Sequence, residues 1–327
     1  MFLIIGTANV DLLVSGFAKM PGDSSDEFTT SNLVFCDEPL KLVLGGNGAN
    51  CAYVLAGLGA PAALGCAIGE DELGKLVQGW LAQREINLTG LVHKAQRATA
   101  YTTIVMDNAL NRLAFHHPGA LATYGEQDLP AELLQATRVL LLTGYTILPQ
   151  WRPHGFANLL RRARQQGAIT AVDIGPAIGR PADLAELTPM LPTIDYLIAN
   201  RHELAVCTGA EDADVGAKRL LQAGARCVIV KLGKAGATIH KAGMHLHVPG
   251  FAVTTRSTVG AGDSFNAGLL YGVQAGWPLE TAVRFGNAVA ALVVGQAQGI
   301  LGSRTLARAE ASMRGLVTKL VPMAWNY

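Results

Sequence analysis

One pattern repeats along most of the chain: a short apolar run, a turn, and a segment whose apolar residues recur at helical spacing. The apolar runs predict strands at Phe2–Gly6, Ala62–Ile68, Thr102–Met106, Arg138–Thr143, Ile169–Asp173, Tyr196–Ala199 and Cys227–Lys231. The periodic segments predict helices at Gly48–Leu58, Asp71–Arg84, Arg152–Gln166, Arg201–Thr208, Val215–Ala223, Gly262–Ala275 and from Pro278 to about Ala297. Strands that alternate with helices favour a largely parallel sheet covered on both faces, so the sequence predicts an α/β fold.

Residues 10–45 and 98–118 interrupt this pattern, because both read as short alternating strands without a helix of their own. We expect them to form one small β appendage beside the main sheet. In open α/β folds the ligand crevice lies outside the carboxyl ends of the strands, so an appendage there would act as a lid. Half of the 327 residues are hydrophobic, which is enough for one sizeable core.

Charge and cysteine usage exclude several classes of protein. The net charge is +1 with no basic block, so nucleic-acid binding is not expected. No apolar run is long enough to span a membrane, and the apolar start has no basic region typical of a signal peptide. The five cysteines form no C-x-x-C pair, so neither a disulfide framework nor a structural zinc site is expected, and free thiols suit the cytoplasm.

The strongest chemical motif is STVGAGDSF at 257–265, which follows a strand-like segment, Phe251–Thr255, and opens a predicted helix. Residues with little or no side chain let backbone N–H groups approach a ligand, and the unpaired N–H groups at a helix start favour an anion. Such a place can stabilise the charge on a transferring phosphoryl group. The small residues concerned are Gly260, Ala261 and Gly262.

Asp263 comes next, at the same predicted helix start. The helix dipole should help to keep its carboxylate ionised, and an ionised carboxylate can take the proton of an attacking hydroxyl. The alternative is a glycine-rich turn with an Asp N-cap, which local chemistry alone slightly favours.

Polar residues also follow or open other predicted elements. The stretch LGGNGANC at 44–51 leads into a helix, and within it Gly46 permits close packing while Asn47 and Asn50 offer amide groups to substrate hydroxyls. Asp11 follows the first strand and could accept hydrogen bonds from two sugar hydroxyls. The structural alternatives are a strand-to-helix turn and an Asp that satisfies local backbone.

Two further motifs follow later strands. In Asn200-Arg-His-Glu203 the glutamate could hold hydrated Mg²⁺ near phosphates, but Asn followed three residues later by Glu is also the spacing of a capping box. The segment KLGKAG at 231–236 could line a nucleotide site through its backbone, with Lys231 or Lys234 near phosphates, or could be a β-turn.

Other motifs are missing from the sequence. There is no G-x-x-x-x-G-K-[ST], so the chain is not a P-loop kinase. No G-x-G-x-x-G follows the first strand, which disfavours a nicotinamide-dependent dehydrogenase. No G-x-S-x-G nucleophile elbow is present.

Taken together and in this order, the motifs resemble those of the ribokinase-like (PfkB) carbohydrate kinases, over nearly the whole chain from Gly6 to about Gly299. The resemblance implies one domain over 1–327, a Rossmann-like three-layer α/β/α sandwich with a mostly parallel sheet, and a small β lid that often also forms a dimer contact. It implies ATP- and Mg²⁺-dependent phosphorylation of a hydroxyl on a sugar or sugar-like substrate.

The resemblance also implies a role for individual residues. Asp263 matches the catalytic base, and the small residues before it match the anion hole, namely Gly260, Ala261 and Gly262. Substrate contacts are implied for Asp11, Gly46 and Asn50, and Asn47 stays a substrate-binding candidate because of its amide group. Nucleotide or phosphate contacts are implied for Asn200, Lys231, Gly233, Gly236 and Asn287, and a water-mediated Mg²⁺ contact for Glu203.

Some residues depart from the family pattern. Ser257 stands where the signature usually begins with Asp, and that Asp helps a monovalent-cation site in related kinases, so potassium activation is in question. Asn47 stands where ribokinases commonly carry Lys, and the segment after Asp173 lacks the Asn and Arg of the family's Asp-x-Asn-x-Arg stretch. A nucleoside kinase of the same fold and a non-catalytic sugar or nucleotide sensor remain alternatives, and the sequence does not identify the substrate.

Overall fold

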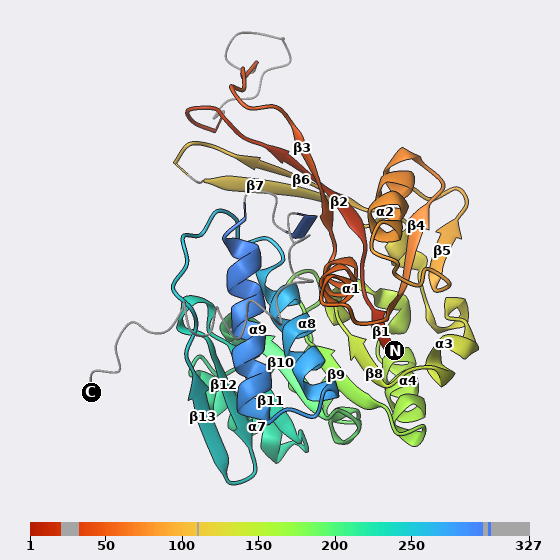
Figure 1. The fold of residues 1–327 in the computed structure, drawn as a ribbon, viewed down its shortest axis with the longest axis vertical. Helices are drawn as coiled ribbons and strands as arrows, with labels where there is room; N and C mark the ends of the chain where they lie inside the picture. The colour runs from red at the N-terminus through yellow and green to blue at the C-terminus, as the bar shows by residue number, and fades with distance from the viewer. Residues whose placement is uncertain (21–32, 110, 297–299, 302–327) are drawn as a thin grey trace.

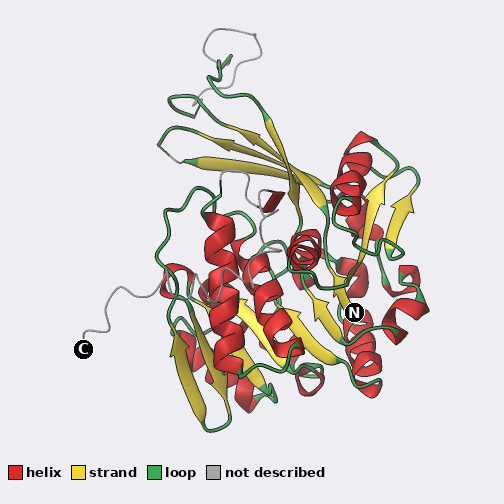
Figure 2. Cartoon of the chain, viewed as in Figure 1, coloured by secondary structure: helices red, strands yellow, loops and turns green. Residues whose placement is uncertain are grey.

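The computed structural model describes residues 1–20, 33–109, 111–296 and 300–301 of the chain. Its main feature is a nine-stranded sheet with helices on both sides (Figures 1 and 2). In spatial order the strands are β13-β12-β11-β10-β9-β8-β1-β4-β5. The three-layer α/β fold predicted from the sequence is therefore confirmed.

Seven of these strands are parallel, and β12 and β13 add an antiparallel hairpin at one edge. In chain order the strands of the sheet are β1 (Phe2–Ile5), β4 (Ala62–Gly69), β5 (Leu91–Lys94), β8 (Val139–Leu142), β9 (Ile169–Asp173), β10 (Tyr196–Asn200), β11 (Cys227–Lys231), β12 (Ala237–Lys241) and β13 (Met244–Val248). The strand β1 lies inside the sheet, paired with β4 on one side and β8 on the other.

Helices cover both faces of this sheet. The described α-helices are α1 (Asn47–Gly57), α2 (Glu72–Ala82), α3 (Ala131–Gln135), α4 (His154–Gln165), α5 (Leu184–Leu187), α6 (Arg201–Thr208), α7 (Ala213–Gln222), α8 (Ala261–Gln274) and α9 (Leu279–Val294). The helices α1, α8 and α9 lie on the face turned to the viewer in Figure 1, and α4 and α7 pack on the other. Among the described helices, none combines the length and apolar character needed to cross a bilayer.

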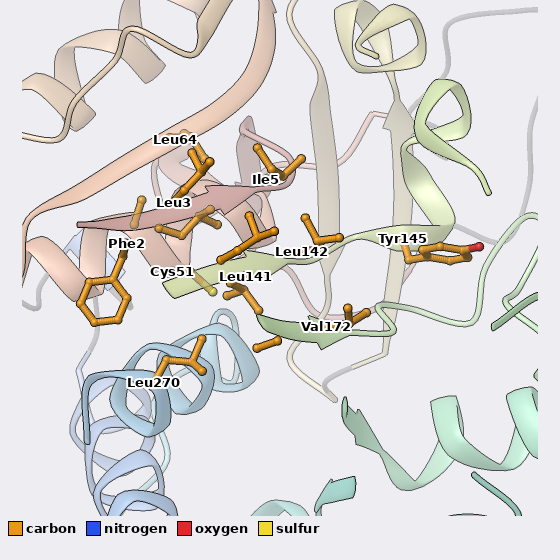
Figure 3. Packing of buried hydrophobic residues seen from close by; sticks show 14 of the residues in the cluster. Phe2, Leu3, Ile5, Cys51, Leu64, Leu141, Leu142, Tyr145, Val172 and Leu270 are labelled. Atoms are coloured by element: carbon orange, nitrogen blue, oxygen red, sulfur yellow. The ribbon is translucent and has the colours of Figure 1, made fainter. Parts of the chain in front are cut away.

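The core lies between β1 and the helices that cover it. Leu3 and Ile5 are fully buried, and Figure 3 shows them between the side chains of neighbouring strands. Cys51 of α1 and Leu270 of α8 close this cluster from the helical side (Figure 3). Strands that are buried on both faces have near-continuous apolar sequences, and for this reason the strands in the interior of the sheet could be predicted from the sequence.

A separate four-stranded sheet stands beside the carboxyl edge of the main sheet (Figure 1). Its strand order is β3-β2-β6-β7, with bounds β2 (Asn9–Val14), β3 (Lys41–Gly45), β6 (Tyr101–Met106) and β7 (Arg112–His117). The regions 10–45 and 98–118 therefore join in one β appendage as predicted, although residues 21–32 and 110 of those regions lie outside the described residues. We call this unit the upper sheet.

Three details differ from the prediction. The segment Phe251–Thr255 is not a strand: it pairs with no strand of the described residues, and Val253 within it is 41% exposed. The strand β5 and the hairpin β12–β13 were not predicted: β5 and β13 are short and half exposed, and β12 is buried but carries polar residues among its apolar ones. The last predicted helix ends at Val294, and Ala297 lies outside the described residues.

Candidate active site

A pocket of about 280 Å³ lies where the carboxyl ends of β8, β9, β10 and β11 meet the start of α8. Seven of the residues predicted from the sequence line it: Asn47, Asn200, Glu203, Lys231, Gly233, Gly262 and Asp263. Four more lining residues were not predicted: Thr143, Asp173, Gly175 and Pro176. Motifs scattered over much of the chain therefore converge on one concave site.

Asp263 lies in the first turn of α8 and faces this pocket. Its Oδ2 accepts a hydrogen bond of 2.8 Å from the Asn50 side chain, and its main-chain carbonyl lies 3.3 Å from the Cys51 thiol. A carboxylate that stays half-buried at the pocket wall and holds one fixed hydrogen bond is positioned to take a proton from a bound hydroxyl.

The pKa of Asp263 is raised to about 7. Burial is the largest cause, and the charges of Asp173 and Asp11 raise the pKa further, while the Asn50 hydrogen bond and Lys231 act in the opposite direction. Burial therefore opposes the ionisation that the helix start was expected to favour. A general base is most effective when its pKa lies near the working pH.

The N-terminus of α8 presents backbone amides without a protein acceptor. Gly260 is the N-cap with φ +76° and has no side chain to cap the helix. Within the described residues, the amides of Gly260 and Gly262 donate to no acceptor, whereas the Ala261 amide reaches the Thr258 carbonyl at 3.3 Å. Unpaired N–H groups at the start of a 14-residue helix form a site suited to an anion.

The glycine-rich stretch before α1 brings that helix against the end of β1. Gly46 has φ +91°, and a Cβ there would lie 2.5 Å from the Thr7 carbonyl oxygen. A Cβ on Gly6 would lie 2.7 Å from the Cα of Gly48, and one on Gly48 would lie 2.8 Å from the Cα of Gly6. Only residues without a side chain permit this approach.

The two asparagines of this stretch are held differently. The Oδ1 of Asn47 accepts hydrogen bonds from the backbone N–H of Thr7 at 3.1 Å and from its hydroxyl at 2.9 Å, so Asn47 ties α1 to the end of β1. Asn50 is buried and donates to Asp263, and its buried Oδ1 has no hydrogen-bond partner among the described residues. Asn50 therefore contacts the candidate base directly, which sequence reasoning did not anticipate.

Asp11 sits on β2 of the upper sheet, near the pocket but not among its lining residues. Its Oδ1 accepts a hydrogen bond of 2.6 Å from the Asn9 side chain. Burial raises the pKa of Asp11 to about 6 against the effect of hydrogen bonds from Asn9 and Thr102. It is thus a strand residue and not a loop residue, and it brings a second carboxylate close enough to raise the pKa of Asp263.

Asn200 and Glu203 form a complete capping box at the start of α6. The Asn200 side chain accepts from the Glu203 backbone N–H at 2.9 Å, and Glu203 Oε2 accepts from the Asn200 backbone N–H at 2.7 Å. The capping interpretation of this motif is confirmed, yet both side chains also line the pocket. Burial raises the pKa of Glu203 to about 7, and Asp173 and Asp263 raise it further against Lys231.

The residue that sequence reasoning missed is Asp173, at the carboxyl end of β9. Its Oδ2 accepts a hydrogen bond of 2.6 Å from Lys231 Nζ and another from the Asn266 amide, and its Oδ1 accepts from the Gly175 backbone N–H. Burial acts to lower the pKa of Lys231, but Asp173, Glu203 and Asp263 outweigh it and raise that pKa. A carboxylate directly after a buried strand was the available signal.

The loop from Lys231 to Gly236 connects β11 to β12. Gly233 has φ +61° and lines the pocket, and Gly236 has φ +93° with its Cα packed so that a Cβ would lie 2.2 Å from the Val248 carbonyl. Asn287 on α9 donates to that carbonyl at 3.1 Å and to the Pro249 carbonyl at 3.2 Å. Asn287 thus fixes the chain after β13 and is not among the residues that line the pocket.

Comparison with known proteins places the chain among sugar kinases. The pfkB family carbohydrate kinase profile matches residues 25–306. The chain is 26% identical to a 5-dehydro-2-deoxygluconokinase of Photobacterium profundum, covering 89% of this chain and 88% of the relative. It is 31% identical to an ATP-dependent ribose-1-phosphate kinase of Halopiger xanaduensis, covering 82% and 84% respectively.

A solved structure agrees in fold. The ribokinase of Arabidopsis thaliana, complexed with ribose and ATP, superimposes with a TM-score of 0.79 at 21% identity, covering 99% of each chain. The profile match spans most of the sequence, and the pocket combines the carboxylate of Asp263, the helix-start residue Gly262 and Lys231 at the edge of the same α/β sheet. The chain belongs to the pfkB family of carbohydrate kinases.

Proposed function

We propose that this protein transfers the γ-phosphoryl group of ATP to a hydroxyl of a sugar or sugar-like substrate, with Asp263 as the base. The observation that carries the proposal is one juxtaposition. A carboxylate with a pKa near 7 and Gly262, whose helix-start amide has no acceptor among the described residues, line the same pocket. The first can accept a proton, and the second can stabilise the negative charge that builds up on a transferring phosphoryl group.

In the proposed reaction the substrate oxygen attacks the γ-phosphorus while its proton passes to the carboxylate of Asp263. The bond from the γ-phosphorus to the bridging oxygen breaks, and ADP leaves. Asn50 holds Asp263 Oδ2, so the other carboxylate oxygen is left for the substrate hydroxyl. Asn50 is therefore a positioning residue in this scheme, in addition to the substrate contact that the family resemblance implies.

The anion side of the pocket is formed by two elements. The amides of Gly260 and Gly262 at the start of α8 have no acceptor among the described residues, and Ala261 lies between them. Lys231 lies beside them, since a Cβ on Gly262 would lie 3.4 Å from its Nζ. We propose that Lys231, now paired with Asp173, neutralises phosphate charge when the nucleotide is bound.

The pocket also suits a hydrated Mg²⁺ ion. Glu203 Oε2 is engaged by the Asn200 amide, and among the described residues no donor reaches its Oε1. Carboxylate oxygens that act through water are usual for Mg²⁺ beside phosphates. When bound, this ion would neutralise the β- and γ-phosphates. Glu203 would hold its water shell, and Asn200 would keep Glu203 in place.

We propose that the upper sheet forms the sugar-binding side of the pocket and acts as its lid. Cross-strand pairing puts Asp11, Thr102 and His116 in one row on one face of this sheet. Thr102 Oγ1 lies 3.1 Å from His116 Nδ1, and Asn9 donates to Asp11. We propose that this row, with Gly46 and Asn47, binds the substrate hydroxyls, and that the sheet excludes water from the reaction.

We propose that the nucleotide lies along Gly233 and Gly236 at the edge of the pocket. Asn287 fixes the segment after β13, and we propose that this segment lies on the adenine side of the nucleotide. ATP as phosphoryl donor agrees with the ATP-dependent activity of the 31%-identical ribose-1-phosphate kinase. Four of the five free thiols are buried, which suits the reducing cytoplasm proposed as the place of action.

The opposite face of the upper sheet is apolar and exposed. Leu42, Leu113 and Phe115 are 38%, 53% and 56% exposed, and strand pairing puts them on the face away from Asp11. Contiguous exposed apolar side chains mark interaction surfaces. We propose that two copies of the chain pair through this face as a homodimer.

The test is a coupled ADP-release assay over a panel of sugars, sugar phosphates and nucleosides, with the Asp263→Asn variant run in parallel. Turnover with at least one sugar or sugar phosphate that the variant loses supports the proposal. Turnover with nucleosides alone would instead favour the nucleoside kinase. A flat assay for every compound, combined with ligand-induced rises in melting temperature, would overturn phosphoryl transfer in favour of a sensor.

A further inference from the structure

A second cluster of chemically active side chains lies away from the kinase pocket, on the antiparallel hairpin at the edge of the sheet. His240 of β12 and His245 of β13 are directly opposed cross-strand neighbours. Asp214, in the first turn of α7, reaches both of them. Nothing in the proposed phosphoryl transfer uses these three residues.

The three side chains converge on one small volume. Asp214 Oδ1 lies 3.7 Å from Nε2 of His240 and 3.5 Å from Nε2 of His245. The two imidazole rings are stacked, with centroids 4.6 Å apart and an interplanar angle of 17°. All three donor atoms lie within 4.8 Å of one another. The cluster thus brings two ring nitrogens and one carboxylate oxygen together from three different elements.

These distances are close to those of a metal centre. Zinc binds His nitrogen at about 2.0–2.1 Å and carboxylate oxygen at about 2.0–2.2 Å, so donors on a tetrahedral ion lie roughly 3.3–3.5 Å apart. The Asp214 contacts to both rings are within a few tenths of an ångström of that spacing. Two imidazoles and one carboxylate are also a ligand set that zinc and similar transition metals prefer.

The three proposed ligands differ in how deeply they are buried, and this gives them different roles. His240 is 3% exposed, so its position is fixed by packing. His245 and Asp214 have side chains about half exposed, at 53% and 47%, so an ion can enter from solvent and their side chains can adjust to it. Thr238 Oγ1 lies 2.9 Å from His240 Nε2, and this hydrogen bond would be exchanged for the metal bond.

We propose that Asp214, His240 and His245 form a binding site for a zinc-like divalent transition-metal ion, with water completing the coordination. Such an ion would tie the β12–β13 hairpin to α7. The site is separate from the phosphoryl-transfer pocket, because Ala237 pairs with Lys231 at the pocket end of the hairpin and His240 lies three residues further along β12. Lys218 is the cation near His240, and its repulsion would weaken binding of the ion.

The test uses the full-length protein with Co²⁺ as a spectroscopic probe and Zn²⁺ as its competitor, in excess Mg²⁺ and without nucleotide. We expect one Co²⁺ per chain with a visible d–d absorption band that Zn²⁺ removes. His245→Gln and Asp214→Asn should each weaken binding at least about tenfold, since even residues that only support a metal ligand cost that much. His93→Gln is the matched control: it is an exposed histidine on β5, at the opposite edge of the sheet.

Thermal unfolding gives a second measurement that does not depend on kinase turnover. Zn²⁺ should raise the melting temperature of the wild type and of His93→Gln, and not that of His245→Gln. Both of the substituted ligands are half exposed, so the variants should fold. Absence of a bound Co²⁺ in the wild type overturns the proposal, as does binding that is unchanged in both ligand variants.

Discussion

Asn50 of α1 donates a hydrogen bond of 2.8 Å to the carboxylate of Asp263 on α8, across 213 positions of sequence. This contact joins the two glycine-rich motifs of the chain at the start of their respective helices. It also lowers the pKa of Asp263 against the larger effect of burial. One amide therefore both orients the proposed base and sets how readily it loses its proton.

Replacing Asn50 with Ala should reduce turnover in a pH-dependent way. Without the amide the pKa of Asp263 rises above its value of about 7, so a smaller fraction of the base is ionised at neutral pH. We expect kcat/KM to fall about tenfold at pH 7 and to recover partly in alkaline buffer. A pH series of kcat/KM for wild type and variant measures this. An equal loss at every pH would contradict the role of Asn50 in setting this pKa.

The wild type should itself show an acid limb near pH 7. A general base must be ionised to act, so activity should be lost as the pH falls through the pKa of Asp263, which is about 7. The profile of kcat/KM reports groups of the free enzyme, which makes it the right quantity to follow. If activity persists unchanged down to pH 5, the desolvated environment described for this carboxylate is wrong.

Replacing Asp263 with Asn should abolish most of the activity and stabilise the fold at neutral pH. Loss of a general base costs about 10²–10⁴ in kcat with substrate affinity largely kept. The folded-state pKa is raised from 3.8, so the folded protein binds a proton more tightly than the unfolded chain, and the stabilisation from that proton is lost as pH rises towards 7. Relative to wild type, the variant should gain on the order of 2 kcal/mol at pH 8.

Urea denaturation at pH 4.5, 6 and 8 checks the stability part of this prediction. The difference between Asp263→Asn and wild type should shrink towards the acidic end, because the unfolded chain begins to bind the proton as the pH approaches its carboxyl pKa of 3.8. Glu211→Gln, a change at an exposed surface carboxylate, is the control and should stay within about 0.5 kcal/mol of wild type. A variant that is less stable than wild type at pH 8 would contradict the burial of this charge.

Replacing Lys231 should lower the free energy of unfolding and raise the pKa values of the carboxylates that face it. Lys231 and Asp173 are a buried pair, with side chains 14% and 5% exposed, and breaking such a pair costs about 3–5 kcal/mol. Lys231→Met should also move the acid limb of kcat/KM upwards, because Lys231 lowers the pKa of both Asp263 and Glu203. The double variant with Asp173→Asn should recover much of the stability.

Lys234→Met is the matched control for this experiment. Lys234 is exposed on the same loop, so its loss should leave the unfolding free energy nearly unchanged. If Lys231→Met and Lys234→Met behave alike in urea, the pair with Asp173 does not hold the pocket together.

Charge placed on the upper sheet should prevent the proposed pairing of two copies. Phe115→Glu puts a carboxylate on the apolar face formed with Leu42 and Leu113, where burial against a second copy would be costly. Sedimentation velocity should change from dimer to monomer. Leu76→Glu, at an exposed leucine on α2, is the control and should leave the dimer intact. A wild-type protein that sediments as a monomer would refute the proposal.

The main sheet was predictable because its strands are buried on both faces and leave continuous apolar runs, as at Phe2–Ile5. The hairpin β12–β13 was not, because β13 alternates buried and exposed residues over only five positions. The segment Phe251–Thr255 is strand-like in sequence, but within the described part of the chain no strand pairs with it. The local sequence pattern therefore predicted the strands in the interior of the main sheet and failed for the strands at its edges.

Part of the candidate site could also be predicted, but from short glycine-rich and polar motifs and not from apolar runs. Glycines and short polar residues after strands can be read from the sequence, and they gave Asp263 and Glu203. Partners distant in sequence cannot be read this way, so neither the contact of Asn50 with Asp263 nor that of Lys231 with Asp173 was foreseen. The raised pKa of Asp263 depends on burial, which only the folded arrangement determines.

The mutual contact of Gly6 and Gly48 has a consequence for engineering. Each lacks room for a methyl group because the other's backbone occupies the space. A library that randomises substrate-facing positions should therefore hold both of them constant, since an alanine at either would push the first turn of α1 away from β1. Asn47 and Asn50 belong to that turn, so such a change would shift the catalytic geometry although no residue that lines the pocket is substituted.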